Sequence, residues 1–134
     1  MTPPTPHIRV SEDTEQASLF RWFRYTRWQG RLLSDFALAI PNGGTRHVLE
    51  AVKLKRTGTK PGVPDVLLPI PAGGYHGLWI EMKAVGGRLS EHQQEVIAML
   101  RSQGYRVDVC FGWDAARTAV ERYLGIAGTL QERG

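Results

Sequence analysis

The sequence is poor in cysteine and contains no long hydrophobic run. Its single cysteine, Cys110, excludes an intrachain disulfide and a zinc site built from several cysteines. No apolar stretch approaches the roughly 20 residues that a membrane-spanning helix needs, and the N-terminus lacks the apolar segment of a secretory signal peptide. We therefore expect no membrane association, a cytoplasmic location in a bacterial cell or a phage-infected host, and a partly buried thiol at Cys110.

Acidic residues are also in short supply, because 13 aspartates and glutamates stand against 17 lysines and arginines and leave a formal net charge of +4. This basic balance favours an anionic partner, with nucleic acid first among the candidates. The length of 134 residues suits one domain with a modest core. We expect a flexible, proline-rich arm over residues 1–10, a single domain over 11–125 and a loose tail over 126–134.

The stretch 62–83 contains an acid, an apolar run, a glycine-rich turn and a second apolar run that carries Glu-x-Lys. In a β-strand, residues two apart point to the same face, so Glu81 and Lys83 project together. If the two runs pair as a hairpin, Asp65 comes near that face. Two carboxylates and one ammonium suit the binding of a divalent metal and the polarising of a phosphodiester. The alternative for Glu81 and Lys83 is an ion pair on an exposed strand.

Such a site has the parts that phosphodiester hydrolysis needs. A Mg²⁺ ion held by Asp65 and Glu81 would lower the pKa of a bound water and accept charge from the phosphate, and the backbone carbonyl of Met82 would complete a metal position. Lys83 would place an ammonium group near the phosphate or the water. Gln93 would hold the water or a phosphate oxygen, or it serves only the capping box of its own helix.

The remaining pattern predicts a small mixed β-sheet flanked by helices, and hence an α/β fold. The segment 48–52 suits a strand as well as a helix, and in a helix Leu49 and Val52 face inward. Because a helix joins the strand of Glu81 to the last strand, we expect these two strands to run parallel through a right-handed crossover. Four helices are expected: one from Ser11 towards Gly30, one over 46–56 with Thr45 as its N-cap, one over 90–104, and one that begins at an N-cap at Asp114. Two further strands are expected over 36–40 and 105–111.

Two further features have both a functional and a structural interpretation. Glu12 lies on the same stripe of the first helix as Phe20 and Phe23, where a carboxylate costs free energy unless it is paired or bound to metal, or it only stabilises the helix N-terminus. The basic segment 53–60 either contacts phosphates beside the acidic site or is a solvated loop. The aromatic residues outnumber what a small core hides, so some of them form a dimer surface, stack on bases or lie scattered on the surface.

Four of these features follow one another along the chain: the first-helix acid Glu12, a Gly-x-Pro-Asp motif ending in Asp65, the pair Glu81 and Lys83, and a Ser-x-x-Gln motif ending in Gln93. In this order they resemble the PD-(D/E)xK nuclease superfamily, and more closely its VRR-NUC group, the virus-type replication-repair nucleases. The resemblance extends over residues 12–124 and includes the segments 40–44, 62–65, 77–83, 87–90 and 104–105.

The resemblance implies a role for each matching residue. Asp65 and Glu81 match the metal ligands, for Mg²⁺ with Mn²⁺ as a substitute, and Lys83 matches the catalytic lysine. Gln93 matches the glutamine that follows the motif. The first-helix acid of the family matches Glu12, with Glu15 as the alternative.

The resemblance also implies a fold and a function. The implied fold is a restriction-endonuclease-like core with the order α-β-(α)-β-β-α-β-α. The implied function follows from the small standalone members of the group, which look like homodimeric, structure-selective endonucleases that act on branched DNA such as Holliday junctions. The alternatives are a non-catalytic nucleic-acid-binding module, which the two acids facing a polyanion disfavour, and a nuclease of general or sequence-specific, restriction-type action, for which the chain has little spare length. The candidate DNA contacts are Asn42, Lys53, Lys55, Arg56, Lys60 and Arg88.

Overall fold

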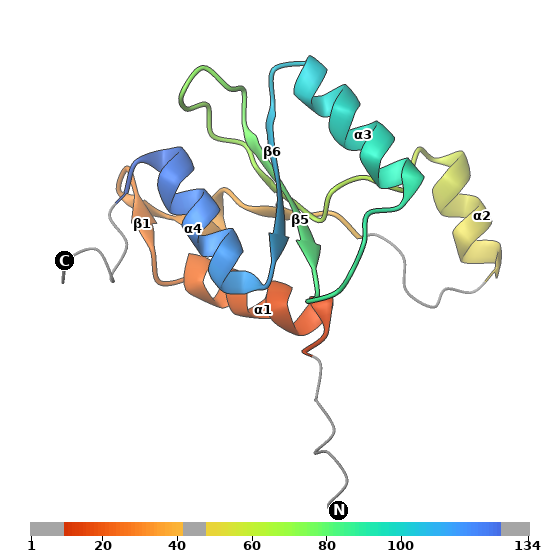
Figure 1. Ribbon diagram of the computed structural model, residues 1–134, viewed down its shortest axis with the longest axis horizontal. Coiled ribbons are helices and arrows are strands. Elements are labelled where there is room, and N and C mark those ends of the chain that lie inside the picture. The colour runs from red at the N-terminus through yellow and green to blue at the C-terminus, as the bar shows by residue number, and fades with distance from the viewer. Residues whose placement is uncertain (1–9, 42–47, 127–134) are drawn as a thin grey trace, which may run out of the picture.

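A computed structural model describes residues 10–41 and 48–126 of the chain (Figure 1). Most of the expected arm and tail lies outside these residues, as do Asn42, Thr45 and the first residues of the helix expected over 46–56. Within the described part of the chain, no helix combines the length and the apolar character that crossing a membrane requires. The elements are α1 (Glu12–Phe23), β1 (Arg27–Trp28), β2 (Arg31–Leu32), the 3-10 helix η1 (Leu33–Asp35), β3 (Leu38–Ala39), α2 (Val48–Arg56), β4 (Val66–Leu68), β5 (Leu78–Lys83), α3 (Glu91–Ser102), β6 (Arg106–Phe111) and α4 (Trp113–Leu124).

Four strands form the central sheet in the order β3–β4–β5–β6. β4 pairs antiparallel with both β3 and β5, whereas β5 and β6 run parallel. A parallel pair needs a crossover connection, and α3 lies in the chain between β5 and β6. The predicted hairpin of β4 and β5, the parallel pairing of β5 with β6 and the mixed α/β class are therefore confirmed.

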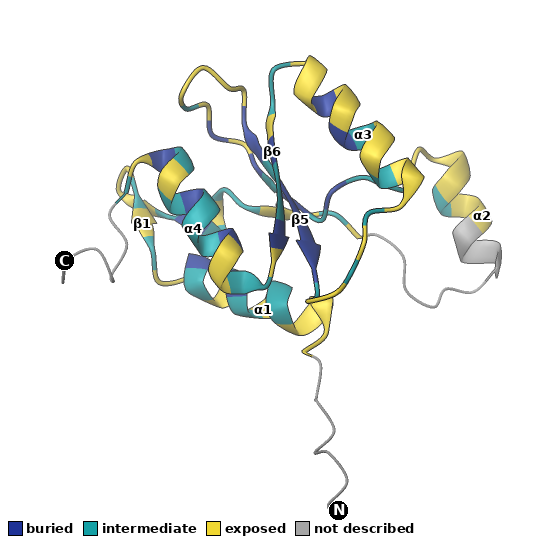
Figure 2. Cartoon of the chain, in the orientation of Figure 1, coloured by how far each residue is buried: buried dark blue, intermediate teal, exposed yellow. Residues whose placement is uncertain are grey.

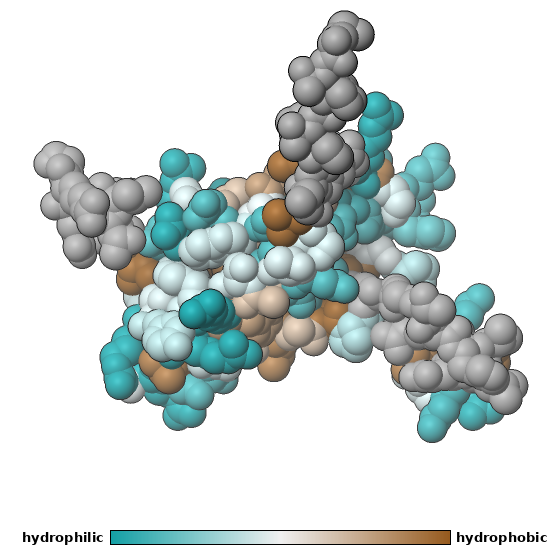
Figure 3. All heavy atoms as spheres, turned by 90° about the horizontal axis from the view of Figure 1, so that it is seen from below, coloured by the Kyte–Doolittle hydropathy of each residue, from teal (hydrophilic) through white to brown (hydrophobic). Residues whose placement is uncertain are grey.

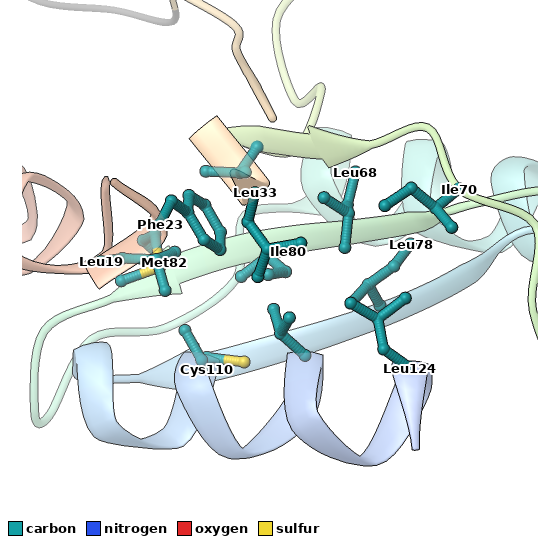
Figure 4. Packing of buried hydrophobic residues seen from close by; sticks show 13 residues of the cluster. Leu19, Phe23, Leu33, Leu68, Ile70, Leu78, Ile80, Met82, Cys110 and Leu124 are labelled. Atoms are coloured by element: carbon teal, nitrogen blue, oxygen red, sulfur yellow. The ribbon is translucent and has the colours of Figure 1, made fainter. Parts of the chain in front are cut away.

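Helices cover both faces of this sheet (Figure 1). The larger core fills the space between the sheet and the helices α1 and α4, and Figure 4 shows its side chains converging from β4, β5 and β6. A smaller core lies under α3, where Ile97 and Leu100 pack against Val107 of β6. β5 is buried along most of its length (Figure 2). Cys110 is only 3% exposed in the larger core, and this burial, with the charge of Asp108, raises the pKa of its thiol to about 12.

The first helix is shorter than predicted. Ser11 is its N-cap as expected, because its hydroxyl accepts a 3.1 Å hydrogen bond from a backbone N–H of the first turn, but the helix ends at Phe23 and does not continue towards Gly30. The chain then forms the β1–β2 hairpin, which reverses at Gln29 and Gly30 with φ angles of 50° and 79°. Two consecutive positive φ angles are typical of the tight turn between antiparallel strands, so Gly30 is a turn residue and not a helix stop.

Three other elements differ in detail from the prediction. The strand expected over 36–40 is reduced to β3, with η1 before it. The segment 48–52 is helical, but Val52 is 60% exposed and does not face inward. The last helix has Gly112 as its N-cap, so Asp114 lies within the first turn. The N–H of Trp113 is bound instead by the carboxylate of Glu15, which reaches it from α1.

Candidate active site

Glu81 and Lys83 lie on the sheet face that α3 covers, because they alternate along β5 with residues that point into the larger core. Their residues are 2% and 7% exposed, and the Lys83 Nζ is 3.8 Å from the Glu81 Oε1. The pair is therefore not the surface ion pair that the strand pattern also allowed. Removing two charges from water costs several kcal/mol per ion, so a buried pair at this depth is weak evidence for stability and a stronger indication of function.

Asp65 is held against the same strand by its side chain. It directly precedes β4, and the antiparallel register that places Val66 opposite Ile80 places Asp65 opposite Glu81. Its backbone carbonyl accepts from the N–H of Ile40 at 2.8 Å, and its Oδ2 accepts from the N–H of Met82 at 2.8 Å. The N–H and C=O of one strand residue point to the same side, so the carbonyl of Met82 also faces the side on which Asp65 lies.

Gln93 forms the capping box that the sequence allowed, and its side chain also binds Glu81. Its side-chain oxygen accepts from the N–H of Ser90 at 2.8 Å, and the Ser90 hydroxyl accepts from the N–H of Gln93 at 3.1 Å, which completes the capping box of α3. Its Nε2 also donates to the Glu81 Oε1 at 3.0 Å. Because both ends of the amide are engaged, the start of α3 fixes the position of Glu81.

Gly62 has a packing role that its place in the Gly-x-Pro-Asp motif does not reveal by itself. Its φ angle is +84°, and a Cβ atom at this position would lie 2.6 Å from the carbonyl carbon and oxygen of His92 and 2.9 Å from the N–H nitrogen of Gln93. The loop before Asp65 therefore packs its backbone directly on the start of α3. Only glycine permits this approach, and the glycine of a Gly-x-Pro-Asp motif is the signal that points to it.

The first helix separates its two candidate acids. Glu15 accepts the backbone N–H of Trp113 and so joins α1 to α4. Glu12 is exposed in the first turn of α1, and its charge helps to raise the pKa of Glu81. The arrangement favours Glu12 as the acid that faces the site and gives Glu15 a structural role.

The surroundings of Glu81 disfavour a negative charge on its carboxyl group. Burial, followed by the negative charge of Asp65, raises the pKa of the Glu81 carboxyl from 4.5 to about 8, with Lys83 opposing this rise and Glu12 adding to it. The Oε2 of Glu81 is buried and has no hydrogen-bond partner among the described residues. A carboxylate oxygen of this kind is costly unless a cation or a donor occupies the space beside it.

The donor set fits a hydrated divalent ion. No cluster of three or more histidine, cysteine, aspartate or glutamate side chains forms a ready metal cage within the described ranges. Asp65, Glu81 and the carbonyl of Met82 nevertheless offer three oxygen donors on neighbouring strands. Mg²⁺ is typically bound by one or two carboxylates and keeps several waters, so these residues suit it.

The candidate DNA contacts on the described chain are exposed. Lys53, Lys55 and Arg56 occupy the last turn of α2, and Lys60 follows in the loop that leads to Gly62. Figure 1 shows α2 at one end of the molecule, beside the start of α3. Exposed lysine and arginine side chains suit phosphate contacts that provide affinity without sequence choice. Arg88 is also exposed, in the loop between β5 and α3.

Most of the large aromatic side chains are structural. Trp22, Trp28 and Trp113 pack against the larger core, and Trp79 packs against the smaller core. Tyr25, by contrast, is 78% exposed, at the end of α1. The expectation of a large aromatic surface for dimer formation or base stacking thus reduces to a few exposed rings.

Comparison with known proteins gives two matches that agree. Residues 6–113 match the family model of the VRR-NUC domain. A solved structure of a "VRR_NUC domain protein" is 31% identical in sequence, with a TM-score of 0.78, and the alignment covers 90% of this chain and 93% of the other. No curated protein was found to match the chain. The structural likeness confirms the restriction-endonuclease-like fold that the sequence predicts.

Proposed function

This chain belongs to the VRR-NUC family of PD-(D/E)xK-type nucleases, and from this premise we propose that it is a Mg²⁺-dependent, structure-selective DNA endonuclease. The proposed substrate is branched DNA of the Holliday-junction type, during DNA repair or replication in a bacterium or a phage. One observation carries the proposal: the Oε2 of the buried Glu81 has no hydrogen-bond partner in the described part of the chain, although Lys83 lies 3.8 Å from the other oxygen of the same carboxylate. A module that only binds a polyanion gains nothing from buried acids at its surface of contact.

Asp65 and Glu81 are the proposed ligands of the metal, with the carbonyl of Met82 as a third donor. A bound Mg²⁺ ion supplies an activated water and neutralises charge on the phosphate, and Mn²⁺ accepts the same oxygen donors. The register of β4 on β5 holds the two carboxylates opposite each other, so the protein and not the ion sets their spacing.

The neighbouring side chains prepare this site for a phosphate. Lys83 presents an ammonium group in a buried setting, where its attraction for a phosphate oxygen is little screened by water. Gln93 binds the Oε1 of Glu81, while the Oε2 has no hydrogen-bond partner from residues 10–41 and 48–126. Glu12, which is exposed in the first turn of α1, is the proposed third acid.

Structure selectivity is proposed to come from pairing two copies of the chain. One domain with one such site cuts one strand, whereas symmetric cleavage of a four-way junction needs two sites related by a two-fold axis. A homodimer satisfies this requirement, and its geometry would select junctions by the angle between the two cut strands.

A cleavage assay tests this proposal. The purified chain is incubated with Mg²⁺ and with linear, flap and four-way-junction DNAs of matched sequence, and paired cuts on the junction are expected to dominate. Asp65→Asn and Lys83→Met should lower kcat by roughly 100-fold or more while junction affinity stays near the parental value. Glu95→Gln, an exposed acid on α3, is the matched control and should cleave normally.

Three outcomes would reject parts of the proposal. Cleavage of all three DNAs at equal rates would exclude structure selectivity. Parental rates from Asp65→Asn would show that the site is misassigned. Tight binding with no cleavage of any DNA in Mg²⁺ or Mn²⁺ would favour the non-catalytic binding module.

A further inference from the structure

Arginines are concentrated at the C-terminal end of α1 and in the β1–β2 hairpin that follows it. Residues 16–34 contain four arginines and no acid, so this stretch alone has a formal charge of +4, equal to that of the whole chain. All four side chains are exposed, and the exposed ring of Tyr25 lies among them in the sequence. We call this region the arginine end; its basic residues are Arg21, Arg24, Arg27 and Arg31.

The acids that the structure describes do not neutralise the arginine end. Within the described residues, Arg21, Arg24 and Arg27 form no ion pair, and Arg31 approaches Asp35 only at 3.9 Å with both side chains largely exposed. Exposed pairs of this kind contribute about 0–1 kcal/mol. Arg21 in the last turn of α1 and its C-cap residue Arg24 are also three residues apart, where like charges repel. A cluster of unpaired like charges is explained when an anionic partner compensates it.

A second basic stretch lies at the other end of the molecule. Residues 51–64 likewise contain four basic residues and no acid, in the last turn of α2 and the loop behind it. Figure 1 places β1 and α2 at opposite ends of the long axis, with the C-terminal end of β5 between them. Figure 3, seen from the side toward which β5 and β6 point, shows hydrophilic and apolar residues intermixed on this face of the molecule.

The spacing suits double-helical DNA. α1 begins at Glu12, whose charge reaches Glu81, and its 12 residues at about 1.5 Å each put the arginine end roughly 18 Å from the site. One base pair of B-DNA advances by about 3.4 Å, so this distance corresponds to about five base pairs. A duplex arm of at least this length is needed to reach from the cleaved phosphate to the arginines.

We propose that the arginine end binds the phosphate backbone of a second duplex arm, on the opposite side of the cleaved phosphate from the arm that α2 binds. This inference rests on the proposed function, because it takes the site of Glu81 and Lys83 as the point of cleavage. The two basic ends then hold two arms of a branched substrate across one active site, and the site lies where the arms meet.

The test is binding of junction DNA in EDTA, so that no cleavage occurs. The variant Arg21→Gln/Arg24→Gln/Arg27→Gln should show a salt dependence of log Kobs that is shallower by about 2 to 3, because each lost phosphate contact removes about 0.9. A second variant, Lys53→Gln/Lys55→Gln, changes the other end. Arg122→Gln, an exposed arginine that lines the pocket between α4 and β6, is the control and should behave as the parent.

Shortening the arms identifies which end holds which arm. Each arm is replaced in turn by a hairpin-capped stem of about three base pairs, roughly 10 Å long, which is too short to reach the arginines. On one truncated junction, the arginine variant should then have the same salt slope as the parent. On a junction truncated at a different arm, the lysine variant should have the same salt slope as the parent. At saturating DNA and low salt, the arginine variant should cleave with the parental kcat in Mg²⁺.

Several outcomes overturn the inference. A second arm at the arginine end is excluded if the arginine variant has the same salt slope as the parent. It is also excluded if the variant loses DNA affinity equally whichever arm is truncated. The same holds if the variant loses affinity for phosphatidylserine vesicles and not for DNA, because the partner is then a membrane surface. If the parent binds DNA with a salt slope that depends on one arm but never cleaves, the proposed function is rejected and this inference stands. If the parent cleaves but its salt slope depends on no arm, the proposed function stands and this inference is rejected.

Discussion

The substitution Gly62→Ala tests how the loop before Asp65 is positioned. Gly62 has a φ angle of +84°, which costs an alanine about 1–2 kcal/mol relative to the right-handed region. Its new Cβ would also lie 2.6 Å from backbone atoms of His92, where neither partner is a flexible side chain that can move aside. Overpacking of this kind adds about 1–3 kcal/mol, so we expect a total loss of about 2–5 kcal/mol in the free energy of unfolding.

The chain offers a matched control for this substitution. Gly74, in the turn of the β4–β5 hairpin, has a φ angle of +85°, but a Cβ atom there would meet nothing within 4 Å. Gly74→Ala should therefore lose only the backbone cost of about 1–2 kcal/mol. The difference between the two variants isolates the contact with α3, which no single variant can do.

Urea unfolding of both variants, without divalent ions, measures the two losses. The contact also holds the start of α3, from which Gln93 binds Glu81 at 3.0 Å, so Gly62→Ala should reduce cleavage under conditions in which the variant is folded. Gly74→Ala should cleave as the parent does. If the two variants are equally stable and equally active, the loop does not depend on its contact with α3 and the reasoning is wrong.

Two further variants test the charges on either side of the sheet. The pKa of Glu81 is about 8 in the folded chain and near 4.5 when the side chain is exposed, so the folded state binds more protons than the unfolded state between these pH values. The metal-free parent should therefore lose stability relative to Glu81→Gln as the pH rises, by at most about 1.4 kcal/mol per pH unit. Parallel urea midpoints of the two proteins between about pH 5 and pH 7 would contradict this. Glu15→Gln weakens the bond to the N–H of Trp113 and should cost about 1–2 kcal/mol in the same assay without lowering kcat; an unchanged stability would mean that α4 does not need this cap.

The positions of the candidate site residues on the sheet could be predicted from the sequence because each follows from a local rule. Strand periodicity places Glu81 and Lys83 on one face, and a hairpin with a glycine-rich turn brings Asp65 to the neighbouring strand. What periodicity could not supply is their burial. The loop after β5 and the start of α3 close over that face, so the pair is 2% and 7% exposed and not a surface ion pair.

The features that the sequence did not predict depend on short elements or distant contacts. β1 and β2 have two residues each, too few for alternation to appear, so the segment after Phe23 resembled a continuing helix. Glu15 and Trp113 are 98 residues apart, and nothing local in either segment indicates that one caps the other. Asp114 therefore appeared to be the cap, since an acid at a helix start is the commoner solution.

The same limit explains why the arginine end was not recognised. Exposed arginines in or beside a surface helix, such as Arg21 and Arg24, are sufficiently explained by solvation when only the sequence is considered. Their significance comes from the three-dimensional arrangement, in which α1 begins beside Glu81 and ends away from it. A one-dimensional charge run cannot show on which side of an active site it lies.

The buried site and the exposed basic ends respond differently to salt, and this difference connects the two proposals. The ammonium of Lys83 and the carboxylate of Glu81 are within 4 Å of each other and nearly inaccessible, so mobile ions screen them little. Lys53, Lys55 and the arginine end are exposed, and their attraction for phosphates weakens as salt rises. Salt should accordingly raise KM and leave kcat nearly unchanged. A kcat that fell in parallel with affinity would mean that the basic ends also bend or open the DNA at the site, because only then would their contacts contribute to the transition state and not only to binding.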